Sequence, residues 1–271
     1  MTLFQAVRLF VFLFFLPAGC ATGLFLLSAR PDARFQNRAI NESSGLAKSG
    51  RFEGIFWTHN DSGDRPRIFA VTRDGKQIGT IDIAGGNNVD WEDIAIDDHG
   101  FLYLCDIGNN RNRRTDLVVY QIPEVDPSRF QQIAVRIRFP FRYPGPHSPD
   151  AEACFYRNGA IYLLTKEPGA GQTALYKLDL SHPEREEVLT LIDEIKIDGL
   201  VTAADITPDG SHLAILTYSG IYLLKPEKES DHFQIEHRRP IRLGQAEAIA
   251  WDGNDLIVTN EGGDMFRLRG L

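Results

Sequence analysis

Asp90-Trp91-Glu92-Asp93-Ile94-Ala95 is the stretch that decides the fold, because variants of it recur along the chain. Most variants place polar, often acidic residues at their first and third positions and end on apolar or small residues. The other copies are Glu42–Ala47, Asp150–Phe155, Gln245–Ala250 and a degraded copy at Thr202–Thr207. In chain order, the first residues of the five copies are 48, 60, 52 and 43 residues apart.

Most copies are followed by a tight turn and then by a short apolar strand, as in Asp97-Asp98-His99-Gly100 before Phe101-Leu102-Tyr103-Leu104. A drifting repeat of about 40–50 residues that is filled with short strands is typical of a β-propeller. We therefore predict an all-β domain over residues 33–271, built from five four-stranded blades. Six blades is the alternative, because the 60-residue spacing has room for further strands.

The last predicted blade is one strand short, since the chain stops at Leu271. The segment Ala33–Ile40 is the expected fourth strand, because pairing it with the last blade closes the ring and removes an open sheet edge. Gln132–Arg138 and Glu187–Ile192 are the predicted outer strands of blades 2 and 3.

Residues 1–28 are predicted to be a signal peptide or a membrane anchor. Arg8 precedes an apolar run of signal-peptide length, and Leu16-Pro17-Ala18-Gly19-Cys20 resembles a bacterial lipobox, with lipidation at Cys20. The alternative is an uncleaved anchor, because Leu9–Ser28 is just long enough to span the bilayer. Both readings predict an extracytoplasmic protein that is attached to the membrane of the cell envelope.

The composition is that of an ordinary globular protein, with 43% hydrophobic and 24% charged residues. The net charge of −8 lacks the basic footprint of a nucleic-acid-binding protein. If Cys20 carries lipid, two cysteines remain. Cys105 and Cys154 form either a disulfide in an oxidising compartment or two buried thiols.

The start of each inner strand and the end of the second strand emerge on the same face of a propeller, so both sets of residues should surround one channel mouth. These sets are rich in carboxylates and amides, and the candidate ligand-binding residues among them are Asn60, Asp61, Trp91, Asn109 and Glu261. Carboxylates that converge on one axis repel each other unless they are protonated, paired with a base or bound to a cation. Calcium prefers such oxygen-rich sets, whereas a lone histidine, His59, argues against zinc.

The succession Ser44-Gly45-Leu46-Ala47, Thr58-His59-Asn60-Asp61-Ser62-Gly63, Asp90–Ala95 and Asp106-Ile107-Gly108-Asn109-Asn110 resembles uncharacterised secreted bacterial propellers. Its repeats are also similar to the SdiA-regulated and esterase-like phytase propellers, and more distantly to the gluconolactonase/paraoxonase propellers. The resemblance covers about Glu42 to Leu271. It implies a central calcium, which would fall to the metal candidates Glu92, Glu152, Glu247 and Asn260.

Three functions are compatible with this pattern. The first is an envelope-anchored binding module that holds a divalent cation, a small ligand or a protein partner at its acidic mouth. The second is a calcium-dependent hydrolase of the lactonase, esterase or phosphoesterase type, with His59 or Asp106 as the candidate catalytic base. The third is an interaction scaffold without a ligand. The sequence alone leaves open whether the protein is an enzyme.

Overall fold

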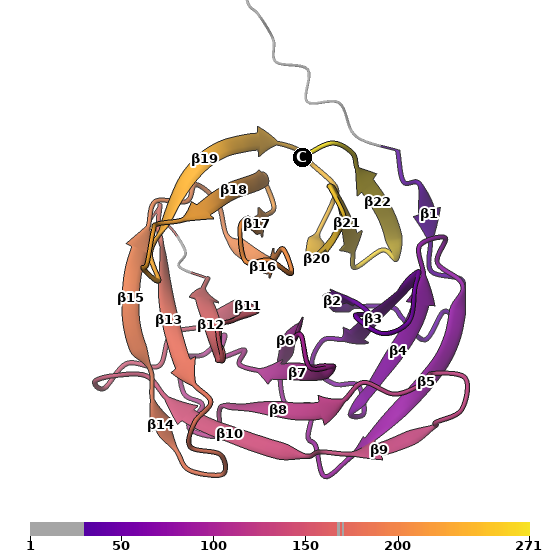
Figure 1. Cartoon of the computed structure of the whole chain (residues 1–271), viewed down its shortest axis with the longest axis horizontal. Helices are drawn as coiled ribbons and strands as arrows, with labels where there is room; N and C mark the ends of the chain where they lie inside the picture. The colour runs from indigo at the N-terminus through magenta and orange to yellow at the C-terminus, as the bar shows by residue number, and fades with distance from the viewer. Residues whose placement is uncertain (1–29, 167–168, 170) are drawn as a thin grey trace, which may run out of the picture.

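The computed structural model describes residues 30–166, 169 and 171–271. Within these residues the secondary structure is entirely β, and five sheets surround a central axis (Figure 1). The protein is a five-bladed β-propeller. The predicted anchor and Cys20 lie outside the described residues. In the described part of the chain, no helix has the length and hydrophobicity that crossing a bilayer requires.

Each blade is a four-stranded antiparallel sheet whose first strand is the innermost. Blade 1 contains β2 (Ser43–Lys48), β3 (Ile55–Asn60), β4 (Arg67–Thr72) and β5 (Gln77–Ala84). Blade 2 contains β6 (Trp91–Ile96), β7 (Phe101–Asp106), β8 (Val118–Pro123) and β10 (Ile137–Arg142). Blade 3 contains β11 (Ala151–Arg157), β12 (Ala160–Thr165), β13 (Thr173–Asp179) and β15 (Thr190–Ile195).

Blade 4 contains β16 (Val201–Ile206), β17 (Leu213–Thr217), β18 (Gly220–Pro226) and β19 (Phe233–Pro240). Blade 5 contains β20 (Ala246–Asp252), β21 (Asp255–Asn260), β22 (Asp264–Leu268) and, from the N-terminal side, β1 (Ala33–Arg34).

The N-terminal strand closes the ring as predicted, although it is shorter than expected. Ala33 lies opposite Met265 in an antiparallel pair of β1 with β22. The chain then crosses to blade 1, where Gln36 N–H donates to the carbonyl of Gly75. Gly75 has a positive φ of 76°, and a side chain there would overlap the backbone of Arg34, so only glycine fits this approach.

The prediction of two outer strands was wrong in one respect, because each of the two segments is divided between two blades. In the first, β9 (Gln132–Ala134) pairs in parallel with β5 of blade 1, and only then does the chain enter β10 of blade 2. In the second, β14 (Glu187–Val188) pairs in parallel with β10, and β15 follows in blade 3. Both added strands cover a sheet edge of the preceding blade that would otherwise expose unpaired backbone groups.

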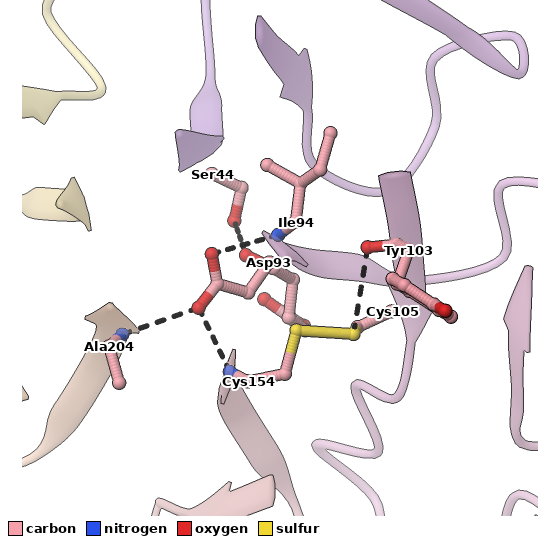
Figure 2. Close-up of a disulfide and its surroundings, with 8 residues drawn as sticks. Ser44, Asp93, Ile94, Tyr103, Cys105, Cys154 and Ala204 are labelled. Carbon is pink, nitrogen blue, oxygen red and sulfur yellow. Dashed lines mark hydrogen bonds between the residues drawn. A yellow bond between two sulfur atoms is a disulfide. The ribbon is translucent and has the colours of Figure 1, made fainter. Parts of the chain in front are cut away.

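The core lies between the blades, with one apolar cluster at each of the five interfaces. Trp57 and Trp91 are fully buried between blades 1 and 2. Between blades 2 and 3, Cys105 of β7 and Cys154 of β11 form a disulfide (Figure 2). The structure thus selects the disulfide from the two states that the sequence left open.

A register shift occurs at the start of every inner strand and positions residues of the candidate site described below. The pairing with the second strand skips one residue in each blade, which is the signature of a β-bulge. The five extra residues are Ser44, Glu92, Glu152, Thr202 and Glu247. The fourth copy of the repeat therefore begins at Leu200, two residues earlier than predicted, and Thr202 is the counterpart of Glu92.

Candidate functional site

The five bulged residues occupy the same position in their blades, at one end of the inner strands. A bulge re-aims a side chain and interrupts the ladder, and bulges are frequent beside functional sites. Three of the five are glutamates, Glu92, Glu152 and Glu247, and all three are less than a tenth exposed. The structure thus brings the three predicted glutamates to one mouth of the channel, where their negative charges act on one another.

The tightest acidic group at this mouth consists of Asp61, Asp90 and Glu92. Asp61 directly follows β3, Asp90 directly precedes β6, and Glu92 is the bulged residue of β6. One carboxylate oxygen from each residue lies within 4.8 Å of the others. This acidic trio therefore belongs to blades 1 and 2, so it is displaced from the centre of the ring of glutamates.

Gly108 supplies the space for two of these carboxylates. Its N–H donates to the carbonyl of Asp90 at 3.1 Å, which brings the loop after β7 against the acidic trio. A Cβ atom at Gly108 would lie 2.1 Å from Glu92 Oε1 and 2.5 Å from Asp90 Oδ2. Any larger residue would displace the two carboxylates, so the glycine is a requirement of the site.

Asn88 fixes the distance between the two loops that carry the trio. Its Nδ2 donates to the carbonyls of Asn60 at 3.2 Å and Asp61 at 3.0 Å, and its Oδ1 accepts the Trp91 N–H at 3.1 Å. Asp106 supports Asp90 in a similar way, because its Oδ1 accepts the Asp90 N–H at 3.0 Å. Asn88 and Gly108 were not among the predicted site residues, although both lie close to predicted ones in the sequence.

Glu92 is the most unusual member of the trio. Its side chain is 3% exposed, yet it forms no hydrogen bond or ion pair with any described residue. Burial raises the pKa of Glu92 well above its ordinary value, and the negative charges of Glu152, Asp61 and Asp90 raise it further. The pKa of Asp90 is raised to about 6, mainly by burial and then by the charge of Asp61.

The other half of the mouth carries its own compensating groups. Lys166, which follows β12, places its ammonium 2.9 Å from Glu152 Oε1, and the Tyr218 hydroxyl donates to Glu247. Burial raises the pKa of Glu152 to about 8 although Lys166 opposes the rise, and it raises the pKa of Glu247 to about 7. Lys166 thus partly compensates the charges of Glu152 and Glu247, and its ammonium also interacts with the charge of Glu92.

The three predicted asparagines are engaged within the protein. The Nδ2 of Asn260 donates to the Leu243 carbonyl at 2.8 Å, and its Oδ1 accepts the Asp264 N–H at 2.9 Å. Asn60 and Asn109 fasten their loops in the same manner, through the Ala39 and Ser148 carbonyls respectively. The amide of Asn260 therefore closes the turn after β21, and its place in the predicted metal set with Glu92, Glu152 and Glu247 stays a prediction.

The two candidate bases, His59 and Asp106, and the candidate ligand-binding residue Trp91 are all buried. His59 is fully buried, burial lowers its pKa, and its ring meets Trp91 edge-on with centroids 5.5 Å apart. Trp91 is also fully buried, so its indole offers no face to a ligand. Asp106 is 1% exposed and bonded to Arg114 Nη1 at 2.8 Å. Glu261 stands at the partly exposed rim, where it accepts from Gln245 at 3.0 Å.

Comparisons with known proteins provide no family for this chain. No family model and no curated protein matches it. Among solved structures, it is similar to a chain of a mitotic checkpoint complex, with 14% identity over 83% of this chain and a TM-score of 0.44. This chain spans 60% of that protein.

Two further solved structures show similar levels of resemblance. The hydrazine synthase of Kuenenia stuttgartiensis has 11% identity over 84% of this chain and 71% of its own, with a TM-score of 0.47. A putative 6-phosphogluconolactonase from Bacteroides uniformis has 11% identity over 84% of this chain and 82% of its own, with a TM-score of 0.48. Likeness at this level concerns the fold and carries no functional argument.

Proposed function

We propose that the protein binds a divalent cation at the mouth of its channel through Asp61, Asp90 and Glu92. The observation that carries this proposal is the Glu92 carboxyl group, which is buried among negative charges without a hydrogen bond or ion pair to a described residue. A buried carboxylate in such surroundings is costly unless it is protonated or bound to a cation. A cation would satisfy all three carboxylates at once, whereas protonation would neutralise one at a time.

Calcium fits the donor set best. It takes six to eight oxygen ligands at about 2.3–2.6 Å, so two ligands on opposite sides of the ion are about 5 Å apart. The separation of the trio, within 4.8 Å, is compatible with one coordination sphere. Three carboxylates leave places for water or for an oxygen-bearing ligand. Zinc is a poor fit, because the trio consists of carboxylates and contains no histidine or cysteine.

The same mouth is where a small ligand or a protein partner would bind in this proposal. We place the protein in the cell envelope, attached through its N-terminal segment as a lipoprotein or by a single helix. The Cys105–Cys154 disulfide supports this placement, since disulfides persist mainly in oxidising compartments. The burial of His59 and Asp106 does not favour the hydrolase alternative, so we extend the proposal to binding and not to turnover.

Calorimetric titration of the metal-stripped protein with calcium tests the proposal, together with metal analysis of the protein as purified. We expect one calcium per chain, and we expect Glu92→Gln to weaken binding by at least about tenfold, since it removes a charged ligand. Glu261→Gln is the matched control, because it removes a carboxylate from the rim of the same mouth and should change the affinity by less than about threefold. Absence of calcium binding by the wild type, or equal affinity in the Glu92→Gln variant, would reject the site and favour a ligand-free scaffold.

A further inference from the structure

The opposite end of the propeller contains a cavity of about 830 Å³. Its wall is formed by the hairpin turns between the first and second strands of four blades, and Trp251 of blade 5 completes it. The turns contribute Lys48–Arg51, Ile96–Gly100, Tyr156–Asn158 and Asp205–Gly210. This volume lies within the range of small-molecule sites, about 300–1,000 Å³.

This cavity is separate from the acidic mouth. Along β6, Glu92 faces the mouth whereas Ile96 lines the cavity, and four residues of strand span about 13 Å. Between them, Asp93 accepts the backbone N–H groups of Cys154, Ala204 and Ile94, which ties three inner strands together (Figure 2). The two ends of the channel can therefore bind different ligands independently.

Most carboxylates of the cavity wall accept hydrogen bonds from donors within the protein. Asp97 accepts two backbone N–H groups and the Tyr103 hydroxyl, and Asp205 accepts the N–H groups of Ile206 and Trp251. Asp209 caps its own turn through Thr207 and Ser211. Asp98 is the exception, since its only described contact is His99 at 3.7 Å.

The basic side chains of the cavity wall are only partly paired with carboxylates. Lys48 and Arg157 are paired with Asp252 and Asp231, whereas Arg51 forms no ion pair within the described residues. The guanidinium of Arg51 donates one N–H to the Glu124 carbonyl at 3.1 Å, so its other donors are available. Its stem crosses the blade 2 turn at Gly100, where a Cβ atom would lie 2.9 Å from Arg51 Cδ.

The absence of a side chain at Gly100 therefore positions Arg51 in the cavity wall. His99, from the same turn, exposes 73% of its side chain, and its Nε2 lies 3.7 Å from Asp98. Arg51 thus presents uncommitted donors to the cavity, while most of the acceptors in the wall are satisfied. A guanidinium with free N–H groups binds the planar edge of a carboxylate or phosphate through two parallel hydrogen bonds.

We propose that this cavity binds a small organic oxyanion, a carboxylate- or phosphate-bearing molecule, with Arg51 as its anchoring residue. Binding at this end requires no metal ion. It does not depend on the proposed cation site, because Arg51 and Glu92 lie at opposite ends of the channel.

Calorimetric titration of the metal-stripped protein at low ionic strength tests this proposal, with citrate and pyrophosphate as separate probes. We expect at least one probe to bind, and the preferred probe distinguishes carboxylate from phosphate recognition. Arg51→Met should weaken that binding by about ten- to a hundredfold, as expected for the loss of a charge-assisted bidentate contact. Arg129→Met is the control, because Arg129 is an exposed arginine outside the cavity and should leave the affinity unchanged.

Glu92→Gln, which removes the proposed calcium ligand, should also leave oxyanion binding unchanged. The proposal is overturned if the folded wild type binds neither probe, or if Arg51→Met and Arg129→Met bind with equal affinity. Loss of binding in Glu92→Gln together with retention in Arg51→Met would assign the oxyanion to the acidic mouth and would likewise overturn it. Circular dichroism of each variant verifies that it is folded.

Discussion

The carboxylate of Asp93 accepts the backbone N–H of Cys154 from the neighbouring blade at 2.9 Å, next to the disulfide that joins the same two blades (Figure 2). The same oxygen accepts the Ala204 N–H of blade 4 at 3.3 Å. Asp93 is completely buried, and burial raises its pKa well above the ordinary value. One side chain of the central repeat motif thus links three blades at the axis.

Replacement of Asp93 by alanine should therefore destabilise the propeller. It leaves buried N–H groups of Cys154 and Ala204 without an acceptor, and each such group costs about 1–3 kcal/mol. We expect urea denaturation to show a loss of about 2–4 kcal/mol in the free energy of unfolding. Asp98→Ala, which removes an exposed aspartate, is the control and should change stability by less than about 0.5 kcal/mol. Equal unfolding midpoints for the two variants would show that Asp93 does not link the blades.

The Cys105–Cys154 disulfide closes a loop across 49 residues of sequence. In the chain-entropy model, a loop of this length stabilises the folded state by about 4 kcal/mol. The double variant Cys105→Ser/Cys154→Ser should lose about that free energy of unfolding in urea. Wild type reduced with a phosphine should show the same loss, and thiol labelling should detect the pair only after reduction. A reduced wild type as stable as the oxidised protein would contradict the prediction.

Calcium affinity should increase with pH. Cations bind the deprotonated carboxylates, whereas burial and neighbouring charges raise the pKa values of Asp90, to about 6, and of Glu92. Binding below those pKa values must release protons, so each pH unit of acidification weakens binding by up to about tenfold per proton released. We expect at least about a tenfold gain in affinity between pH 5.5 and pH 7.5.

Titrations in buffers of different ionisation enthalpy count the protons released by calcium. The Glu261→Gln variant should show the same pH dependence, because Glu261 is outside the acidic trio. An affinity that stays constant from pH 5.5 to pH 7.5, without proton release, would exclude the trio as the ligands.

The repeat motif predicted the architecture well for a physical reason. Every copy begins an inner strand and carries the bulge, so the periodicity of the motif is the periodicity of the blades. The closing role of Ala33–Ile40 followed from the missing fourth strand. The division of Gln132–Arg138 was not predictable from local pattern, since β9 pairs with an edge strand about 50 residues earlier, and only the fold places that edge nearby.

The sequence predicted the end of the propeller at which the candidate residues lie, but not which of these residues lie close together. The position of Glu92, Glu152 and Glu247 in their copies was sufficient to place them together. The sequence made Lys166 a candidate to balance the acidic cluster, but it did not identify Glu152 as its partner or show that the Asn260 amide would be bonded to Leu243. Those contacts are made between residues that are far apart in the local pattern. The selection of Asp61, Asp90 and Glu92 as the proposed cation ligands likewise required distances from the three-dimensional structure.

The contribution of Lys166 to the free energy of unfolding in the absence of metal should depend on pH. Burial raises the pKa of Glu152 to about 8, so the carboxyl group is protonated in the folded protein at pH 6 and ionised at pH 9. A carboxyl whose pKa is raised on folding stabilises the protein below its unfolded pKa, and this contribution is lost as the pH rises through the folded value. Removing the Lys166 ammonium raises the folded pKa further and leaves the ionised carboxylate unpaired.

Lys166→Met should therefore cost little at pH 6 and up to about 1.4 kcal/mol at pH 9, because a carboxyl that loses its partner can remain protonated one pH unit above the wild-type pKa of about 8. Urea denaturation in the presence of a chelator at both pH values measures the difference. Lys177→Met is the matched control, because Lys177 pairs with Asp231, whose pKa lies below its ordinary value, so its loss should be the same at pH 6 and pH 9. If Lys166→Met also costs the same at both pH values, Glu152 does not titrate in this range, and Lys166 is not the group that compensates its charge.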